Sequence, residues 1–332
     1  MCTGIVWLLA GLAVGISTVT AQGFTSTDAD TMLQAHTSAF YRVEGDRAWI
    51  AETTRGGKAS FWMRAEQMEM VLDAYERTRD AQLLEMFTRL FRGFVADYGE
   101  DWSHNEFNDD IMWMVIACVR AHLLTGESAY LERGRANFDA CHARAWSDDL
   151  GGGLWWKTDN KSKNACVNGP AAIAACLLAR ATGEEAYREK AGKIYAWERA
   201  TLLDASTGRV YDHIRGDGEL GRHSFSYNQG TFAGAAHLLG DTESALLAAT
   251  YAMKHYGEDG LMPDYGEDGD GGGFNGICAR WISRLVKDHP HPGLEAWLRH
   301  NAEAAWKVRR ASDNLSWCHW DRPTPRGRRC SF

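Results

Sequence analysis

The sequence predicts an all-α protein in which helical hairpins form a closed ring, an (α/α) toroid. Three observations lead to this fold class. Apolar residues recur with helical spacing in nearly every segment, a short helix-ending signal returns at a fixed interval, and short connections alternate with long polar ones. The chain has 332 residues and few prolines, and no Pro- or Ser-rich linker divides it, so we expect one large catalytic domain.

Helical spacing is clear in eleven segments, as in the stripe formed by Met68, Val71, Leu72 and Tyr75. The expected helices are Thr31–Tyr41, Ala59–Arg77, Asp80–Tyr98, Asn108–Leu124, Ser128–Arg144, Ala165–Ala181, Glu184–Leu203, Ser226–Leu239, Thr242–Tyr256, Phe274–Lys287 and Leu294–Arg309. The residues 26–28, Ser-Thr-Asp, are expected to cap the first of them. Strand signals are sparse, and residues 208–212 are the best extended piece.

The repeat consists of a glycine between two helices at positions 126, 183 and 240, a constant step of 57 residues. Glycine ends a helix by taking a left-handed conformation, and an acidic residue then starts the next helix. Thr78-Arg79-Asp80 resembles an earlier copy without glycine. The long polar joins at 145–163, 204–225 and 257–273 alternate with these short ones. They would therefore share one face of a ring, which is where a site is expected.

The two ends of the chain differ from this pattern. Residues 1–22 combine an apolar run with small residues near Ala21, which predicts a secretory signal peptide. The catalytic domain is then 23–310, and the Arg-rich tail 311–332 is expected to be irregular. We expect a secreted, periplasmic or cell-surface protein, monomeric and without a membrane span in the mature chain. Cys318 and Cys330 are positioned to bridge the tail. Four other cysteines lie in apolar helical patterns and are expected to be small buried hydrophobic residues: Cys118, Cys166, Cys176 and Cys278.

Composition and net charge exclude some classes of partner and favour others. The net charge is −8 and no basic block precedes the extreme C-terminus, so nucleic acid is not an expected partner. The 14 tryptophans exceed what a core requires and fit a carbohydrate site, where flat rings stack on sugars. No Cys/His spacing typical of zinc occurs, and the acidic loop 265–273 lacks the ligand pattern of a calcium loop. We therefore expect no metal and no cofactor.

Two adjacent carboxylates, Asp109 and Asp110, precede the apolar run Ile111–Val119. One interpretation is structural, because Asn108 or Asp109 can cap the helix and an acid there meets the positive end of the helix dipole. However, one acid suffices for a cap, and two neighbouring acids repel, so that one tends to stay protonated. A neutral acid beside an ionised one is the pair that glycoside hydrolysis uses.

The long loops supply candidate sugar contacts. Trp155 and Trp156 follow three glycines and are interpreted either as a plug at the end of the ring or as a stacking platform, which we favour. Asn164, with Asn168 four residues on, either caps a helix or binds hydroxyl groups; the two interpretations have equal weight.

Two further groups of polar residues extend this set. Tyr227, Asn228 and Gln229 open a helix with more polar groups than a buried start requires, and they are candidates for holding a sugar. The alternative is capping by Asn228 alone. Asp264 and Glu267 lie in the acidic loop region and are candidates for lining the cleft.

Taken in order, these motifs resemble glycoside hydrolase family 76, the endo-α-1,6-mannanases, from about residue 30 to 310. The motifs are Asn-Asp-Asp-x-x-Trp at 108–113, Gly-Gly-x-Trp-Trp at 152–156, Lys-Asn at 163–164, Tyr-Asn-Gln-Gly at 227–230, Phe-x-Gly-Ile-x-x-Arg-Trp from Phe274, and Asn-Ala-x-x-Ala-Trp at 301–306. The resemblance implies an (α/α)6 barrel that cleaves α-1,6-linked mannan or its oligosaccharides with retention of configuration. It also implies that Asp109 is the nucleophile and Asp110 the general acid/base. Asn275 departs from the pattern, where the family usually has Lys.

Other functions remain open from the sequence. A transglycosylase would pass the same covalent intermediate to a sugar hydroxyl. A sugar epimerase on a similar toroid would need a His base, and only His104 and His223 lie near the motifs. A glycan-binding protein without catalysis would keep the Trp platform but would not need two adjacent acids.

Overall fold

The computed structural model describes residues 23–53, 55–266 and 269–326. The expected signal peptide, Glu267 and Cys330 lie outside the described residues. The chain divides into two compact units, one formed by the residues up to Phe94 together with those from Met253 onward, the other by Val95–Ala252.

The described residues form eleven α-helices, the number that the periodicity predicts. They are α2 (Ser26–Phe40), α3 (Phe61–Thr78), α4 (Ala81–Tyr98), α5 (Asn108–Thr125), α6 (Ser128–Ala145), α7 (Ala165–Thr182), α8 (Glu185–Thr201), α9 (Ser226–Leu238), α10 (Thr242–His255), α11 (Gly271–Asp288) and α12 (Pro292–Lys307). Eight short strands accompany them, all in small antiparallel sheets. The strands are β1 (Tyr41–Glu44), β2 (Arg47–Thr53), β3 (Gly56–Lys58), β4 (Ser162–Asn164), β5 (Leu203–Asp204), β6 (Arg209–Val210), β7 (His213–Arg215) and β8 (Leu220–Gly221).

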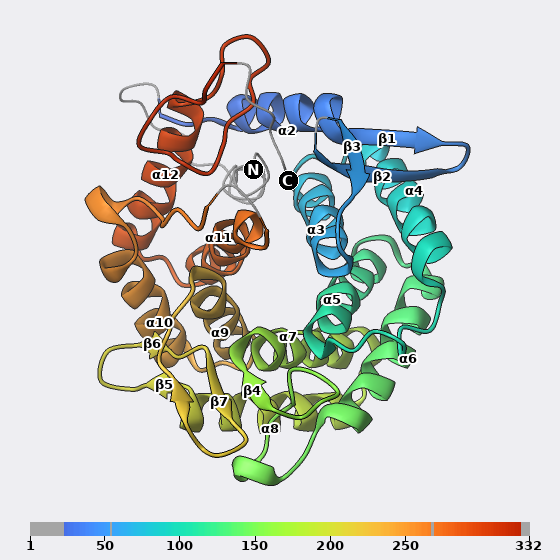
Figure 1. Ribbon diagram of the computed structural model, residues 1–332, viewed down its shortest axis with the longest axis vertical. Helices are drawn as coiled ribbons and strands as arrows, with labels where there is room; N and C mark the ends of the chain where they lie inside the picture. Colours follow the sequence, from blue (N-terminus) through green and yellow to red (C-terminus); the bar gives the residue numbers. More distant parts are fainter. Residues whose placement is uncertain (1–22, 54, 267–268, 327–332) are drawn as a thin grey trace. The chain divides into compact units, whose positions relative to one another are not determined.

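In the unit Val95–Ala252, α5, α7 and α9 pack one beside the next, and α6 and α8 are the hairpin partners of α5 and α7 (Figure 1). The glycine repeat is confirmed. Gly126 and Gly183 end α5 and α7 in the left-handed conformation, and Gly240 adopts it directly after α9. α7 is apolar and long enough to cross a membrane by composition, yet most of its residues are buried among its neighbours.

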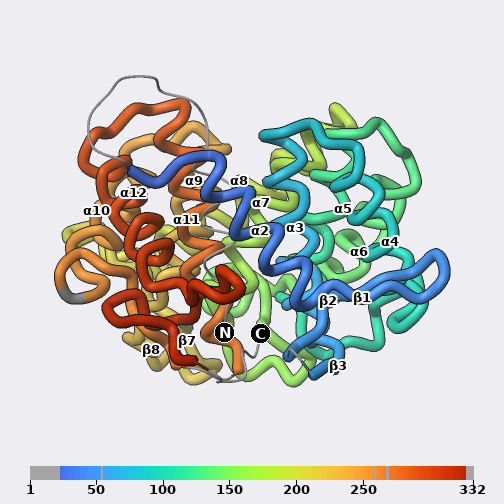
Figure 2. Tube along the Cα trace, turned by 90° about the horizontal axis from the view of Figure 1, so that it is seen from above, coloured from blue at the N-terminus to red at the C-terminus, as the bar shows by residue number. Residues whose placement is uncertain are grey.

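In the other unit, α2 is followed by a hairpin, β1–β2, that the sequence analysis missed (Figure 2). Helix α2 also begins at Ser26, five residues before the expected start. Thr25 is its cap, and its hydroxyl accepts a hydrogen bond from the backbone N–H of Asp28. Arg79 ends α3 at φ 58°, as a glycine would, and so confirms the earlier copy of the repeat.

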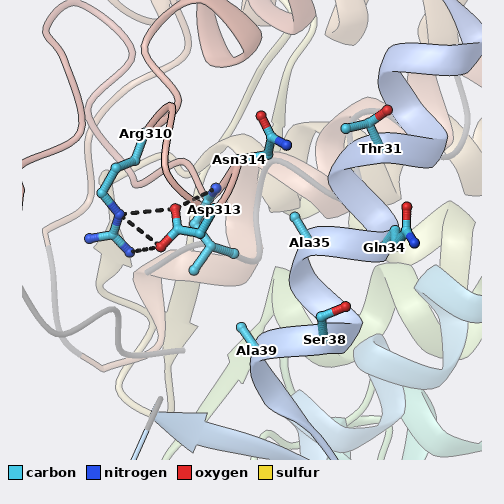
Figure 3. A pocket seen from close by; sticks show the side chains of 9 residues that line it. Thr31, Gln34, Ala35, Ser38, Ala39, Arg310, Asp313 and Asn314 are labelled. Carbon is cyan, nitrogen blue, oxygen red and sulfur yellow. Dashed lines mark hydrogen bonds and ion pairs between the residues drawn. The ribbon is translucent and has the colours of Figure 1, made fainter.

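The tail has no helix or strand over 311–326, as expected, but it is packed. Trp317 and Trp320 are buried, and the Ser316 hydroxyl donates to the Ala305 carbonyl on α12 at 2.8 Å. A surface groove of about 500 Å³ lies between α2 and the start of the tail (Figure 3). Arg310 and Asp313 pair with each other there, and none of the expected site residues lines the groove.

Candidate active site

The acid pair lies in the first turn of α5, within the unit Val95–Ala252. Phe107 is the N-cap residue and makes no side-chain cap, so the expectation that Asn108 or Asp109 caps this helix is wrong. Asp109 and Asp110 instead occupy helical positions inside the first turn. Unpaired N–H groups and the positive end of the dipole lie there, and both favour negative charge.

Asn108 holds the start of α5 in place through hydrogen bonds to the neighbouring segments. Its amide donates to the carbonyl of Trp155 at 2.8 Å, and its oxygen accepts a hydrogen bond from Arg144 at 2.7 Å. Its backbone N–H donates to the carbonyl of Trp156 at 2.9 Å. Because Asn108 is buried and its side-chain oxygen and nitrogen both bind protein, the structure gives it a positioning role.

Asp109 and Asp110 are both partly exposed and interact strongly. Desolvation raises the pKa of Asp109 to about 8, and the negative charge of Asp110 adds to the rise. The indole of Trp156 and the thiol of Cys166 act in the opposite direction, since they stabilise the anion. At neutral pH the pair is therefore expected to hold one proton, as two neighbouring acids that repel each other would.

Asp110 has a fixed neighbour in Asn105, whose amide donates to its Oδ2 at 2.9 Å. Asn105 is itself oriented, because its side-chain oxygen accepts the N–H of Phe107 at 2.9 Å. An amide donor at this position constrains one carboxylate oxygen and so orients the carboxyl group.

The two tryptophans of the first long loop have different environments. Trp155 is 6% exposed and packs in the interior, so it offers no stacking face; only Trp156 remains partly exposed. The ring of Phe107 lies 5.6 Å from that of Trp156, and the Lys157 ammonium lies 5.6 Å from the Trp156 ring centroid. The expected platform is thus reduced to one ring, which adjoins Asp109.

Lys163 holds this loop. Its fully buried ammonium donates to the carbonyls of Asp149 and Gly152, both at 2.6 Å, and to that of Ser147 at 2.9 Å. It also lies 4.7 Å from the ring centroid of Trp155. Burial lowers the pKa of Lys163 to about 8. One side chain therefore fixes the Gly-rich turn that precedes both tryptophans.

The far side of the acid pair is formed by α7, α9 and the segment before β7. Cys166 on α7 interacts with Asp109. Burial raises the pKa of this thiol well above its usual value, and the charges of Asp109 and Asp212 add to the rise. Asp212 accepts a hydrogen bond from the amide of Asn228 on α9 at 3.1 Å. The side-chain oxygen of Asn228 is buried without a partner among the described residues. Asn164 precedes α7 and accepts a hydrogen bond from Ser162 at 2.6 Å without capping the helix.

Three other polar residues from the motifs are directed into the protein. Gln229 is fully buried, and its amide donates to the carbonyls of Gly208 and Ala248 at 2.8 and 2.9 Å. Asn168 is also fully buried and pairs with the backbone of Leu154. Tyr227 is 9% exposed, and its ring is stacked on that of Phe225.

Asp264 belongs to the other unit, where it forms an ion pair with His319. The neighbouring Asn275 is buried and donates to the carbonyl of Pro263 at 2.8 Å, so the residue that departs from the family pattern supports this loop.

Sequence reasoning missed Asn105, Cys166 and Asp212 as neighbours of the acid pair. Asn105 lies three residues before the motif and was recoverable as a polar residue preceding a helix. Cys166 was interpreted only as a small buried hydrophobe, and Asp212 only as part of an extended piece. Nothing in their spacing indicates that α7 and the segment before β7 meet the start of α5.

An all-α chain with two adjacent carboxylates that share a proton, an aromatic ring beside them and amide groups around them has the groups that a glycoside hydrolase requires. Comparison with known proteins agrees. The model of glycosyl hydrolase family 76 matches residues 25–328, so the chain belongs to glycoside hydrolase family 76.

Two solved structures are similar to most of this chain. The α-1,6-mannanase GH76A of Salegentibacter sp. HEL1_6, an inactive variant in complex with α-1,6-mannotriose, has a TM-score of 0.84 and 30% identity; the match covers 92% of this chain and 94% of that chain. The Lin0763 protein from Listeria innocua has a TM-score of 0.83 and 25% identity, with 92% of each chain covered. The fold class is thus the (α/α)6 barrel of the family, as the resemblance implies.

Fungal relatives match over part of their length. The mannan endo-1,6-alpha-mannosidase DCW1 of Saccharomyces cerevisiae is 32% identical over 239 residues, which cover 62% of this chain and 52% of the yeast protein. A putative mannan endo-1,6-alpha-mannosidase of Schizosaccharomyces pombe is 23% identical over 301 residues, covering 79% and 67%. The chain therefore spans about half to two thirds of these relatives.

Proposed function

We propose that this protein is a retaining, endo-acting glycoside hydrolase that cleaves α-1,6-mannosidic bonds in mannan-type polysaccharides. The observation that carries the proposal is the proton-sharing pair Asp109–Asp110 at the start of α5. The Salegentibacter mannanase supports it, because inactive variants of that enzyme replace two consecutive aspartates and bind α-1,6-mannooligosaccharides.

The proposed reaction has two steps. Asp109 attacks the anomeric carbon, while Asp110 gives its proton to the glycosidic oxygen and the leaving sugar departs. Asp110, now ionised, then takes a proton from water. That water displaces Asp109 and releases the sugar with its original configuration. Each step exchanges one bond to the anomeric carbon, and the pair ends with the single proton that it held at the start.

This cycle needs the shared proton on Asp110, although burial and the charge of Asp110 both raise the pKa of Asp109. Bound substrate favours the form of the pair in which Asp110 holds the proton. Positive charge develops on the sugar ring beside Asp109 and lowers its pKa, and the glycosidic oxygen accepts a hydrogen bond from protonated Asp110. Asn105 keeps Asp110 oriented while the proton moves.

Substrate contacts are proposed for the groups that remain available around the pair. The ring of Trp156 is partly exposed and suited to stacking on a sugar. Asn228 is fully buried, so we assign it the positioning of Asp212, to which its amide donates a hydrogen bond. Tyr227 and Asn164 are retained as candidates near the same helix starts. Gln229, Trp155 and Asn108 bind protein groups or lie in the interior, and we assign them positioning roles; Asp264 is left without a proposed sugar contact.

The relatives act on mannan, which fits an enzyme that works outside the cell on a large polymer. We propose secretion or surface location on that ground, together with the signal-like residues 1–22. The substrate partner is then an α-mannan chain or its oligosaccharides.

The direct test replaces each acid in the full-length protein. Asp109→Asn and Asp110→Asn are each expected to lower the release of mannooligosaccharides from unbranched α-1,6-mannan by roughly a thousandfold or more. The chain offers a matched control in Glu184 and Glu185, a consecutive acid pair at the start of α8 and outside the site, whose double Gln variant should keep its activity. Equal loss in the control, or full activity of Asp109→Asn, would overturn the proposal.

A further inference from the structure

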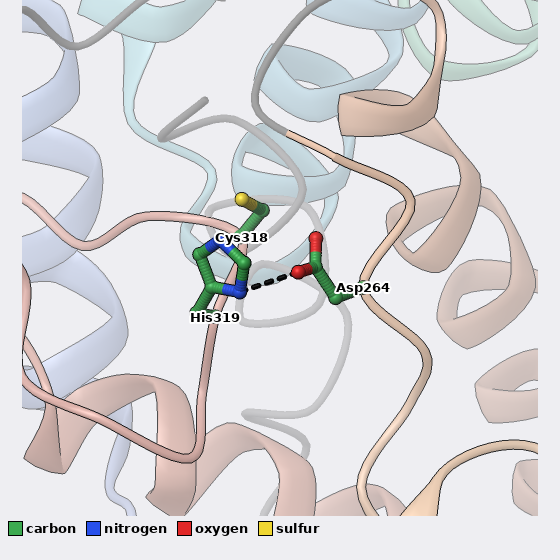
Figure 4. Close-up of side chains that lie close together, drawn as sticks. All are labelled: Asp264, Cys318 and His319. Carbon is green, nitrogen blue, oxygen red and sulfur yellow. Dashed lines mark ion pairs between the residues drawn. The ribbon is translucent and has the colours of Figure 1, made fainter.

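Three side chains with metal-binding atoms converge in the unit that contains the tail. They are Asp264, in the loop after the short 3-10 turn Glu258–Gly260, and Cys318 and His319, in the tail (Figure 4). One carboxylate oxygen, one thiol sulfur and one imidazole nitrogen all lie within 4.8 Å of one another. Neither the proposed reaction nor the packing of the helices uses this cluster.

The three groups are held in place by the protein. The imidazole of His319 pairs with the Asp264 carboxylate, and its ring lies edge-on to the buried ring of Trp317 at 4.3 Å. The Cys318 thiol is half-buried, forms no disulfide with another described cysteine, and interacts with the same carboxylate. The tail backbone is anchored close by, since Ser316 binds α12.

We infer that Asp264, Cys318 and His319 form a binding site for zinc or a similar thiolate-binding divalent cation, which fastens the tail to the loop 261–266. A thiolate, an imidazole and a carboxylate are the three ligand types that zinc takes in proteins. Zinc–ligand bonds of about 2.0–2.3 Å require only small side-chain shifts from the observed arrangement. Asp264 is exposed, so a water molecule can fill the fourth position.

Binding exchanges protons for the metal in a balanced way. The thiol loses its proton to solvent as the sulfur–metal bond forms, and His319 binds as neutral imidazole. Calcium and magnesium are disfavoured, because only one of the three ligands is an oxygen. No zinc spacing can be recognised in the sequence, because Asp264 is far along the chain from the adjacent pair Cys318-His319.

A substitution at Arg322 is expected to strengthen zinc binding, whereas substitutions of the ligands weaken it. Its guanidinium lies 2.9 Å from Nδ1 of His319 and so places a positive charge beside the proposed metal position. Replacing it by Gln removes both a competitor for the imidazole and a repulsion. Arg322→Gln should therefore bind zinc more tightly than the unaltered protein.

The test uses the full-length protein, freed of metal by dialysis against a chelator and titrated with zinc chloride in a calorimeter. We expect one equivalent bound, at least tenfold weaker binding in Cys318→Ser and His319→Gln, and stronger binding in Arg322→Gln. Cobalt chloride should give a thiolate-to-cobalt absorption band that Cys318→Ser loses. Cys176→Ser, which removes another partly exposed cysteine, should keep both properties.

Three results would overturn the inference: no zinc uptake by the unaltered protein, uptake that Cys318→Ser and His319→Gln leave unchanged, or a mass spectrum showing Cys318 in a disulfide in the native protein. Circular dichroism of each variant ensures that a loss of binding is read only from folded protein. Mannan hydrolysis is a separate measurement, so failure here leaves the proposed function intact.

Discussion

At the scale of single residues, the proposed chemistry depends on the proton shared by Asp109 and Asp110. The two acids lie in the first turn of α5, where the helix dipole favours charge, yet desolvation and mutual repulsion hold the pKa of Asp109 near 8. The site thus keeps one proton where isolated aspartates would keep none. A single hydrogen bond to either carboxyl group is enough to change the pH range over which the pair retains that proton.

This predicts the pH dependence of kcat/KM. The active form carries one proton on the pair, so activity should fall as pH rises through about 8, where the free enzyme loses it. The Cys166 thiol stabilises ionised Asp109 and lowers its pKa. Cys166→Ala should therefore raise that pKa and move the alkaline fall to higher pH. Initial rates on α-1,6-mannan between pH 5 and 10 measure the shift.

Cys278→Ala is the matched control, because Cys278 is also a buried free cysteine, on α11. Its alkaline limb should coincide with that of the unaltered enzyme. A limb that moves to lower pH in Cys166→Ala would contradict the role given to the thiol.

At the scale of the structural element, Lys163 positions the Gly-rich turn before Trp155 and Trp156. It supplies three carbonyls of this turn with hydrogen bonds, and Lys163→Met would leave them buried without a donor. We expect the unfolding free energy to fall by about 2–4 kcal/mol. We also expect faster proteolytic cleavage within 147–153, measured by mass spectrometry of a limited digest. Lys161→Met, which alters an exposed lysine nearby, should have neither effect.

A second element-scale prediction concerns the contact between α3 and α11. Arg280 is buried against Glu66, Glu69 and Asp73, and burial raises the pKa of Glu66 to about 7, from 4.5. Between these pH values the folded protein keeps a proton that the unfolded chain has released, so stability falls as pH rises. The loss attributable to Glu66 is at most about 3 kcal/mol, at 1.36 kcal/mol for each pKa unit.

Urea unfolding at pH 5 and pH 8 tests this. In Glu66→Gln the difference between the two unfolding free energies should be smaller by about 1–3 kcal/mol than in the unaltered protein. Glu85→Gln, at an exposed position of α4, provides the control and should leave the difference unchanged. A difference that Glu66→Gln leaves unchanged would contradict the raised pKa of this carboxyl group.

Much of the fold was readable from sequence because helical period and glycine helix ends are local signals. Gly126 and Gly183 mark their turns unambiguously, and even Arg79 was recognised from its context. The hairpin β1–β2 was missed because its residues alternate weakly, and the start of α2 was misplaced because Thr25 was not recognised as the cap.

The same distinction between local and tertiary signals applies to the residues of the site. The acid pair and Trp156 belong to contiguous motifs that can be recognised in the sequence, whereas Asp212 and Cys166 approach the pair only through tertiary packing. Sequence patterns also could not show which polar residues are bound to backbone groups inside the protein. Gln229 and Asn108 are as polar as Asn228, yet both are engaged by backbone groups.

At the scale of the whole molecule, membership of glycoside hydrolase family 76 brings an (α/α)6 fold together with the acid pair. An endo-acting enzyme cuts within the polymer, so early digests of α-1,6-mannan should contain a ladder of oligosaccharides, resolved by anion-exchange chromatography. Early release of mannose alone would contradict endo action. Added mannooligosaccharide acceptors should leave this ladder unchanged if water is the main acceptor, and lengthened products would indicate transglycosylation.

The central claim is that Asp109 forms a covalent bond to the sugar, while Asp110 protonates the leaving oxygen and then takes a proton from water. An α-mannobiosyl fluoride needs no acid to depart, so Asp110→Ala should form the glycosyl-enzyme but hydrolyse it slowly, lacking the base. Peptide mass spectrometry of the quenched reaction is predicted to find the disaccharide on Asp109. A sugar attached to a different residue would contradict the account, as would an unlabelled enzyme that still consumes the fluoride.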